Sequence, residues 1–127
     1  MKVAALQTPL ASVGSGDGLA LIRRRMAQCD AEGVAILCCP EAAVGGLADY
    51  APDPRQIAVT PSAVLAWLGP MANTRLTTVV GFTELGTDGS IYNSAAVVSR
   101  GALAGVYPAP DESNLFRMPP IVTTGPR

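Results

Sequence analysis

The run of apolar residues from Val34 to Cys39 places the strongest constraint on how this chain folds. An uninterrupted run of this length is typical of a strand that is buried on both faces of a sheet. Pro40 ends the run, because proline has no backbone N–H to donate to a sheet ladder. A strand of this kind needs other elements to cover it, so the run predicts an interior strand in a layered domain.

A helical pattern precedes this strand, with Asp17 as its expected N-cap and Gly33 as its expected left-handed end. We expect Arg23, Arg24 and Gln28 on its solvent side. Its apolar face consists of residues at spacings of three and four: Leu19, Ile22, Met26 and Cys29.

A second helix is predicted to start with Thr60 as N-cap and Pro61 in the first turn, and Pro70 should kink or split it. The predicted apolar face of this helix contains Val64, Leu65, Leu68, Met71 and Ala72.

Further strands are expected over residues 2–7, 77–83, 91–99 and 102–107, with turns at 87–90 and 100–101. The last three should form an antiparallel meander. Strand, helix, strand, helix and meander together predict an α/β layered fold.

Composition narrows the functions that the chain could perform. Its 127 residues carry a net charge of −1 without a long run of either sign, so we expect neither nucleic acid nor a membrane as a partner. The sequence contains no histidine, which excludes a Ser-His-Asp triad, a Cys-His pair and a histidine zinc site. Its three cysteines lack metal-motif spacing, and we expect neither a metal nor a cofactor.

Apolar residues make up 49% of the chain and charged residues 15%, against roughly 25% charged in a typical globular domain. We therefore expect apolar surface that is covered through self-association or by a partner fragment. The opening residues 1–7 hold no apolar stretch long enough for a secretory signal or a bilayer span, which predicts a cytoplasmic protein.

Glu41 is the strongest candidate for chemistry. It follows Pro40 at the carboxyl end of the predicted buried strand, where the active sites of open α/β sheets gather. A carboxylate that emerges from a buried strand should be partly desolvated and able to act as a general base. The structural alternative is a surface loop glutamate or an N-cap contact.

Several segments, taken in order, resemble the nitrilase superfamily of carbon–nitrogen hydrolases. They are residues 3–7 as the opening strand, 35–41 with 45–47 as the strand and loop of the first catalytic glutamate, 80–84 as the next strand, and 91–95 with 101 and 105–107 as the hairpin before the catalytic lysine. The resemblance covers residues 1–107. It implies the N-terminal half of a four-layer α-β-β-α sandwich, with a mixed sheet and helices on one face.

The resemblance also implies a reaction on a small amide or nitrile substrate. In the family, a cysteine thiolate attacks the carbonyl or nitrile carbon, a glutamate transfers protons, and a lysine ammonium stabilises the oxyanion. Glu41 would be the glutamate. The pattern breaks after Tyr107, where Pro108 replaces the Arg-Lys of the family, and Lys2 is the only lysine in the chain.

The other chemical side chains have structural interpretations. The nucleophilic cysteine of the family lies on a later strand, so we expect Cys38 and Cys39 to point to opposite faces and to fill the core. Glu84 matches a glutamate outside the catalytic set and should serve a turn or a salt bridge.

Asn93 and Ser94 should hydrogen-bond near the site or brace the sheet. Trp67 is expected to pack rather than to bind a ligand.

Two functional hypotheses follow from these residues. The first is a truncated or frame-shifted carbon–nitrogen hydrolase, inactive as this chain, with a partial domain over residues 1–107 and an irregular, proline-rich tail over 108–127. The second is a non-catalytic interaction module that associates with a full-length family member. A free-standing enzyme with different chemistry is the weakest reading, because the chain has one lysine and no histidine.

Overall fold

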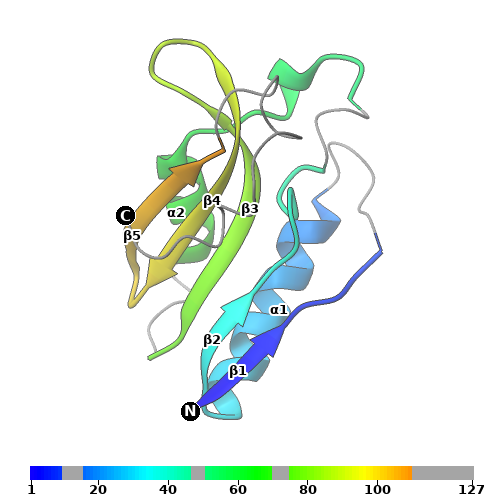
Figure 1. Cartoon of the computed structure of the whole chain (residues 1–127). Helices are drawn as coiled ribbons and strands as arrows, with labels where there is room; N and C mark the ends of the chain where they lie inside the picture. The colour runs from blue at the N-terminus through cyan, green and yellow to red at the C-terminus, as the bar shows by residue number, and fades with distance from the viewer. Residues whose placement is uncertain (10–15, 47–50, 70–74, 110–127) are drawn as a thin grey trace.

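The computed structural model describes residues 1–9, 16–46, 51–69 and 75–109. These residues form five strands, two α-helices and a short 3-10 helix (Figure 1). In chain order they are β1 (Lys2–Ala5), α1 (Asp17–Ala31), β2 (Val34–Cys38), η2 (Pro54–Gln56), α2 (Pro61–Leu68), β3 (Thr77–Leu85), β4 (Ile91–Ser99) and β5 (Ala102–Pro108).

The strands form one mixed sheet whose spatial order is the order of the chain, β1-β2-β3-β4-β5. β1, β2 and β3 are parallel to one another. β3, β4 and β5 pair antiparallel, which confirms the predicted meander. The parallel half places the ends of β1 and β2 and the start of α1 at one edge, the arrangement in which α/β proteins place their sites.

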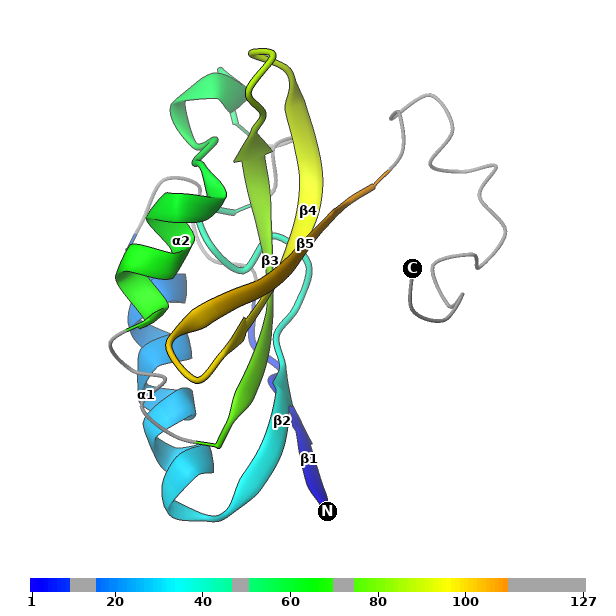
Figure 2. The same cartoon turned by 90° about the vertical axis from the view of Figure 1, so that its left-hand side faces the viewer.

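Both helices lie on the same face of the sheet (Figure 2). Ile22 and Met26 of α1 and Val64 and Leu68 of α2 are buried there. They pack with alternate residues of the inner strands, among them Val80, Phe82, Ala96 and Val98. Alternation follows from the two-residue period of a strand, and it confirms the predicted α/β class with helices on one face.

The helix ends show why these segments are helical. Thr60 caps α2 as predicted, because its hydroxyl accepts a hydrogen bond from the Ala63 N–H at 3.2 Å. Gly33 follows α1 in the left-handed region, with a φ of 72°. The prediction of Asp17 as N-cap was wrong by one residue. Gly16 is the cap, and Asp17 lies in the first turn, where its charge still favours the positive end of the helix.

Arg23 corrects a second expectation. The sequence placed it on the solvent side of α1, but its guanidinium donates two hydrogen bonds, at 3.1 and 2.9 Å, to the carbonyl oxygen of Trp67. Carbonyls in the last turn of a helix have no partner within the helix. Arg23 therefore ties α1 to the end of α2, while the Trp67 side chain packs against the core as predicted.

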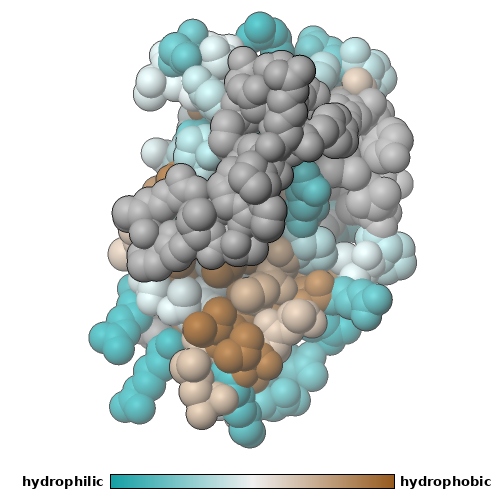
Figure 3. Space-filling view, viewed as in Figure 1, coloured by the Kyte–Doolittle hydropathy of each residue, from teal (hydrophilic) through white to brown (hydrophobic). Residues whose placement is uncertain are grey.

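The opposite face of the sheet carries neither α1 nor α2 (Figure 2). We call it the helix-free face. Strand alternation and the cross-strand pairs assign to it Val3, Ile36, Cys38, Val79, Val97 and Tyr107. Val3 is 59% exposed and Tyr107 is 50% exposed. Figure 3 looks onto this face and shows hydrophobic side chains gathered on it.

This face corrects the interpretation of residues 34–39 as a strand buried on both sides. β2 lies inside the sheet, but only its helix-covered side is deeply buried: Leu37 is 2% exposed, whereas Cys38 is an exposed residue. Cys38 is therefore not a core residue. Cys39, which points the other way, packs against the core as expected.

Some predictions fall outside the described residues, namely those for Pro70, Met71, Ala72 and residues 110–127. β5 runs one residue beyond the predicted boundary at 107. None of the helices in the described part of the chain is long and apolar enough to cross a membrane.

Candidate functional site

The segment that carries Glu41 is fastened to β3 on both sides of that residue. On one side, the Cys39 N–H donates to the Val79 carbonyl at 2.8 Å. On the other, the Val44 N–H donates to the Gly81 carbonyl at 3.1 Å. The backbone of Glu41 is therefore held over β3 rather than extending freely from the end of β2.

Gly81 is the point where this segment comes closest to β3. A Cβ built on residue 81 would lie 2.6 Å from the Ala42 nitrogen, 2.7 Å from the Pro40 oxygen and 2.9 Å from the Glu41 Cα. Contacts this short with backbone atoms would force the segment to move, so a side chain does not fit here. The sequence analysis did not single out Gly81 as a site residue, although a glycine inside a strand is the sequence signal for close backbone approach.

The turn itself needs unusual backbone angles. Ala42 has a φ of 49°, in the left-handed region that residues other than glycine seldom occupy, and it is 5% exposed. Glycine follows at positions 45 and 46, with φ values of 85° and 91°. Strain of this kind at a non-glycine residue persists only where the surrounding contacts enforce it.

The Glu41 side chain reaches β4. Its carboxylate accepts a hydrogen bond from the Asn93 side-chain amide. Ser94, the next residue of β4, is buried on the helix side, so strand alternation puts Asn93 on the opposite, helix-free side. Glu41 is an exposed residue, which contradicts the expectation that it is partly desolvated, because the helix-free face leaves it in contact with solvent.

Glu84 belongs to the other side of the sheet. The buried Ser94 hydroxyl donates to the Glu84 carboxylate at 2.6 Å. This hydroxyl partner replaces the turn or salt-bridge role expected for Glu84. Because Asn93 and Ser94 point to opposite faces, the two carboxylates of Glu41 and Glu84 do not form an acid–base pair.

Cys39, Cys29 and Lys2 each have surroundings that do not suit a reaction at Glu41. Burial, with a smaller contribution from the neighbouring Cys38, raises the pKa of Cys39 to about 12, so its thiol is protonated at neutral pH. Burial also raises the pKa of Cys29, which lies on α1. Lys2 pairs with Val34 at the far end of β2 and donates to the Glu32 carbonyl at 3.0 Å.

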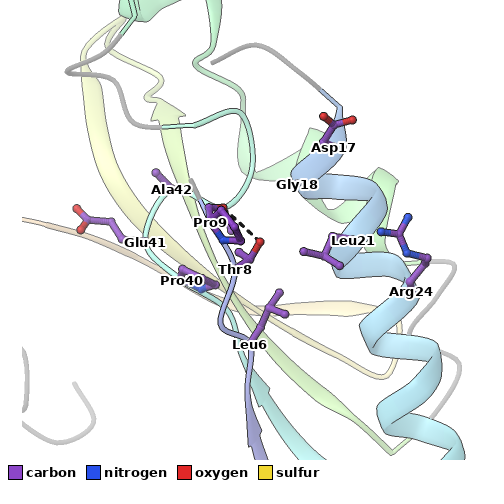
Figure 4. Close-up of a pocket in the computed structure, with 11 residues that line it drawn as sticks. Leu6, Thr8, Pro9, Asp17, Gly18, Leu21, Arg24, Pro40, Glu41 and Ala42 are labelled. Atoms are coloured by element: carbon purple, nitrogen blue, oxygen red, sulfur yellow. Dashed lines mark hydrogen bonds between the residues drawn. The ribbon is translucent and has the colours of Figure 1, made fainter. Parts of the chain in front are cut away.

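A pocket of about 260 Å³ opens beside the Glu41 segment, between α1 and the segment after β1 (Figure 4). Its lining combines apolar residues such as Leu6, Leu21 and Pro40 with Asp17 and Arg24 of α1. The Glu41 side chain extends away from α1 (Figure 4), toward Asn93. Glu41 is among the residues that line the pocket, but its side chain is hydrogen-bonded to Asn93.

No protein-family model and no curated protein sequence matches the chain. Solved structures do match it by fold. An amidase from Nesterenkonia sp. superposes with a TM-score of 0.66 at 21% sequence identity, covering 87% of this chain and 43% of the amidase chain. An N-terminal amidase gives a TM-score of 0.70 at 17% identity, covering 89% of this chain and 29% of that one.

A glutamine-dependent NAD⁺ synthetase from Cytophaga hutchinsonii gives a TM-score of 0.65 at 18% identity. That match covers 82% of this chain and 18% of the synthetase chain. The chain thus spans less than half the length of these proteins. Identities this low support a shared fold and nothing finer. The described residues therefore share the fold of part of these amidase and synthetase chains.

Proposed function

We propose that these residues form the glutamate-bearing part of a carbon–nitrogen hydrolase of the amidase or nitrilase type, and that this polypeptide alone does not catalyse hydrolysis. One observation carries the proposal: Glu41 stands at the carboxyl end of β2 on an amidase-like fold, fastened to β3 and hydrogen-bonded to Asn93. The substrate of the intact protein would be a small amide or nitrile.

The chemistry explains both halves of the proposal. An exposed carboxylate at the end of a parallel strand can accept a proton from an attacking group and return it to a leaving amine. Attack also requires a nucleophile, and the developing oxyanion requires a fixed positive charge. Cys39 is protonated at neutral pH, and Lys2, the only lysine in the chain, lies at the far end of β2. Even the exposed Cys38 would therefore lack a lysine to stabilise an oxyanion beside Glu41.

Hydrolysis assays with the purified 127-residue chain test this proposal. Ammonia release from small aliphatic and aromatic amides and nitriles should stay at the background of the Glu41→Ala variant. Glu32→Ala serves as the matched control, because Glu32 is an exposed glutamate at the end of α1. Turnover that persists in Glu32→Ala and disappears in Glu41→Ala would overturn the claim of inactivity.

We also propose that the break in pattern after Tyr107 reflects a truncation or a shift of reading frame. Pro108 stands where the resemblance implies Arg-Lys, and the chain covers 43% of the amidase and 29% of the N-terminal amidase. Translating the gene in its other frames tests this. A Tyr-Arg-Lys segment followed by a cysteine-bearing strand supports a frameshift, and finding neither in any frame counts against it.

The second candidate function is a non-catalytic interaction module, and the helix-free face favours it. The side chains on that face include Val3, Ile36, Val79, Val97 and Tyr107. These five side chains carry no charge, and the charged Glu41 on the same side lies at the carboxyl end of the parallel strands. We propose a second copy of this chain as the occupant, in an isologous contact.

Cys38 is a built-in probe of that contact, because it is exposed on the helix-free face. Its rate of alkylation at neutral pH should fall as the protein concentration rises, in parallel with a rise in sedimentation coefficient. A monomer at all concentrations with a constant Cys38 rate would exclude self-association. Protection of Cys38 by an added full-length family member, and not by the chain itself, would instead assign the face to that partner.

We further propose a cytoplasmic location. Cys29, Cys38 and Cys39 are all free, and reducing compartments keep thiols in that state. Fractionation of the source cells, with immunodetection of the chain, checks the location directly.

A further inference from the structure

We infer that Asn93 is a positioning residue for Glu41, and that Gly81 provides the space on which this arrangement depends. The inference rests on the role proposed above for Glu41 and deepens it. It assigns to two residues on neighbouring strands the task of holding one exposed carboxylate in a single orientation.

The main chain on either side of Glu41 is fixed first. The Cys39 and Val44 N–H groups both donate to β3 carbonyls, at 2.8 and 3.1 Å. Between these hydrogen bonds the backbone passes over Gly81, where a Cβ would lie 2.7 Å from the Pro40 oxygen and 2.9 Å from the Glu41 Cα. Any side chain at position 81 would lift this backbone and carry Glu41 away from the sheet.

The side chain is fixed second. An exposed glutamate samples several rotamers. Asn93 selects one by donating from its amide to the carboxylate. Asn93 pairs across the strands with Thr83, two residues beyond Gly81. One strand thus supplies the space for the backbone, and its neighbour supplies the hydrogen bond for the side chain.

The chemical type of the partner suits a general base. A carboxylate in its ionised form only accepts hydrogen bonds, so the amide must present its NH₂ group to it. An amide stays neutral at every working pH and therefore orients Glu41 without a counter-charge. The bond engages one carboxylate oxygen, which leaves the second oxygen to take a proton from a reacting group, and fixed geometry of this kind is what proton transfer requires.

Nuclear magnetic resonance of the Asn93 side-chain amide tests the hydrogen bond in the whole chain. One Asn93 Nδ2 proton should resonate downfield and exchange slowly with solvent. Glu41→Ala should abolish that signature. Glu41→Gln should retain it in weakened form, because the glutamine carbonyl can still accept the bond. The Gln28 side-chain amide, which donates to Glu32 at 3.3 Å, is the internal control and should not change.

The carboxylate side gives the complementary readout. In Asn93→Ser the two γ protons of Glu41 should collapse toward one chemical shift, because the side chain regains rotamer freedom. Backbone shifts of β3 and β4 should stay in place, which separates lost positioning from lost structure. Glu41 γ protons that remain distinct in folded Asn93→Ser, or an Asn93 amide indifferent to Glu41→Ala, would overturn the inference.

Gly81→Ala tests whether the Glu41 segment needs a residue without a side chain at position 81, and Gly16→Ala is its matched control. No heavy atom lies within 4 Å of a Cβ built at Gly16, and its φ of −81° suits alanine. Folded Gly81→Ala should lose the Asn93 signature, and Gly16→Ala should keep it. Retention of the signature in Gly81→Ala would refute the role of Gly81.

These outcomes are distinguishable from failure of the proposed function. Turnover by the unmodified chain would refute its inactivity and leave the amide signature intact. Absence of the signature in an inactive chain would refute the positioning role alone.

Discussion

At the scale of single residues, the adjacent cysteines Cys38 and Cys39 have thiols in opposite environments. Cys38 is exposed on the helix-free face, whereas Cys39 turns toward the core, where burial raises the pKa of its thiol to about 12. Because the thiolate is the reactive form, neutral-pH alkylating reagents should modify Cys38 and leave Cys39 unmodified in the folded chain. Mass spectrometry of the digested product checks this selectivity.

The raised pKa of Cys39 also predicts how stability depends on pH. An unfolded cysteine has a pKa of about 8.5, well below that of the folded Cys39 thiol. The folded state therefore keeps the proton in a range where the unfolded state loses it. The contribution of this thiol to stability is complete below pH 8.5 and decreases as the pH rises toward 12. Denaturant melts should show a steeper alkaline loss in the wild type than in Cys39→Ala, and equal slopes would contradict the assignment.

Arg23 gives a prediction of a different kind. Its guanidinium donates twice to the Trp67 carbonyl, and a hydrogen bond that involves a charged group contributes about 1.5–3 kcal/mol. Arg23→Ala should lower the free energy of unfolding by roughly 1–3 kcal/mol, since the contact is only partly buried. Arg24→Ala, at an exposed neighbour on the same helix, should change it by less than about 0.5 kcal/mol.

The residues that the sequence identified and those that it missed differ in the range of their contacts. The position of Glu41 just after β2 could be predicted, because a strand, a proline and a carboxylate follow one another in the chain, and its catalytic role stays a prediction. Asn93 could not be assigned to it, since the two residues are 52 positions apart and meet only through strand pairing. The contact of Arg23 with the Trp67 carbonyl could not be predicted for the same reason, because Trp67 lies 44 positions away on another helix.

At the scale of elements, most helices and strands could be predicted from signals that lie within a few residues of each element. The proline and threonine that start α2, the glycine after α1 and the period of β4 all act within a few residues, and each element is present. The interpretation of residues 34–39 failed differently. An apolar run indicates an interior strand, which β2 is, but it does not reveal whether both faces are covered. Burial on the second face depends on chain or partners outside the strand itself.

The N-cap of α2 can be tested on its own. The Thr60 hydroxyl accepts from the Ala63 N–H at 3.2 Å, and loss of such a cap costs about 1 kcal/mol. Thr60→Ala should therefore lower the midpoint of denaturant unfolding, whereas Thr60→Ser should retain most of the stability. Ser62→Ala, at an exposed position two residues further along, is the control. Equal losses in Thr60→Ala and Ser62→Ala would argue against a capping role.

At the scale of the whole molecule, the sheet divides the described residues into a covered side and an uncovered one. The covered side contains the buried core from Ile22 to Val98. The uncovered side carries the exposed Val3, Cys38 and Tyr107, with Glu41 and Asn93 at the carboxyl end of the parallel strands. A covering polypeptide would therefore lie beside the candidate site, so the proposed association and the proposed site chemistry would involve the same side of the molecule.

A charge placed on the helix-free face should weaken that association without unfolding the chain. Val3 is 59% exposed, so Val3→Glu adds a charge at little cost to the monomer. In a two-copy contact, the same substitution buries a carboxylate twice and removes apolar contact. A loss of about 1.4 kcal/mol in the contact weakens it about tenfold, and sedimentation should register at least that change. Ala27→Glu, on the exposed side of α1, should leave association unchanged. Equal effects of the two variants would show that the contact uses another surface, because Val3 belongs to the helix-free face and Ala27 does not.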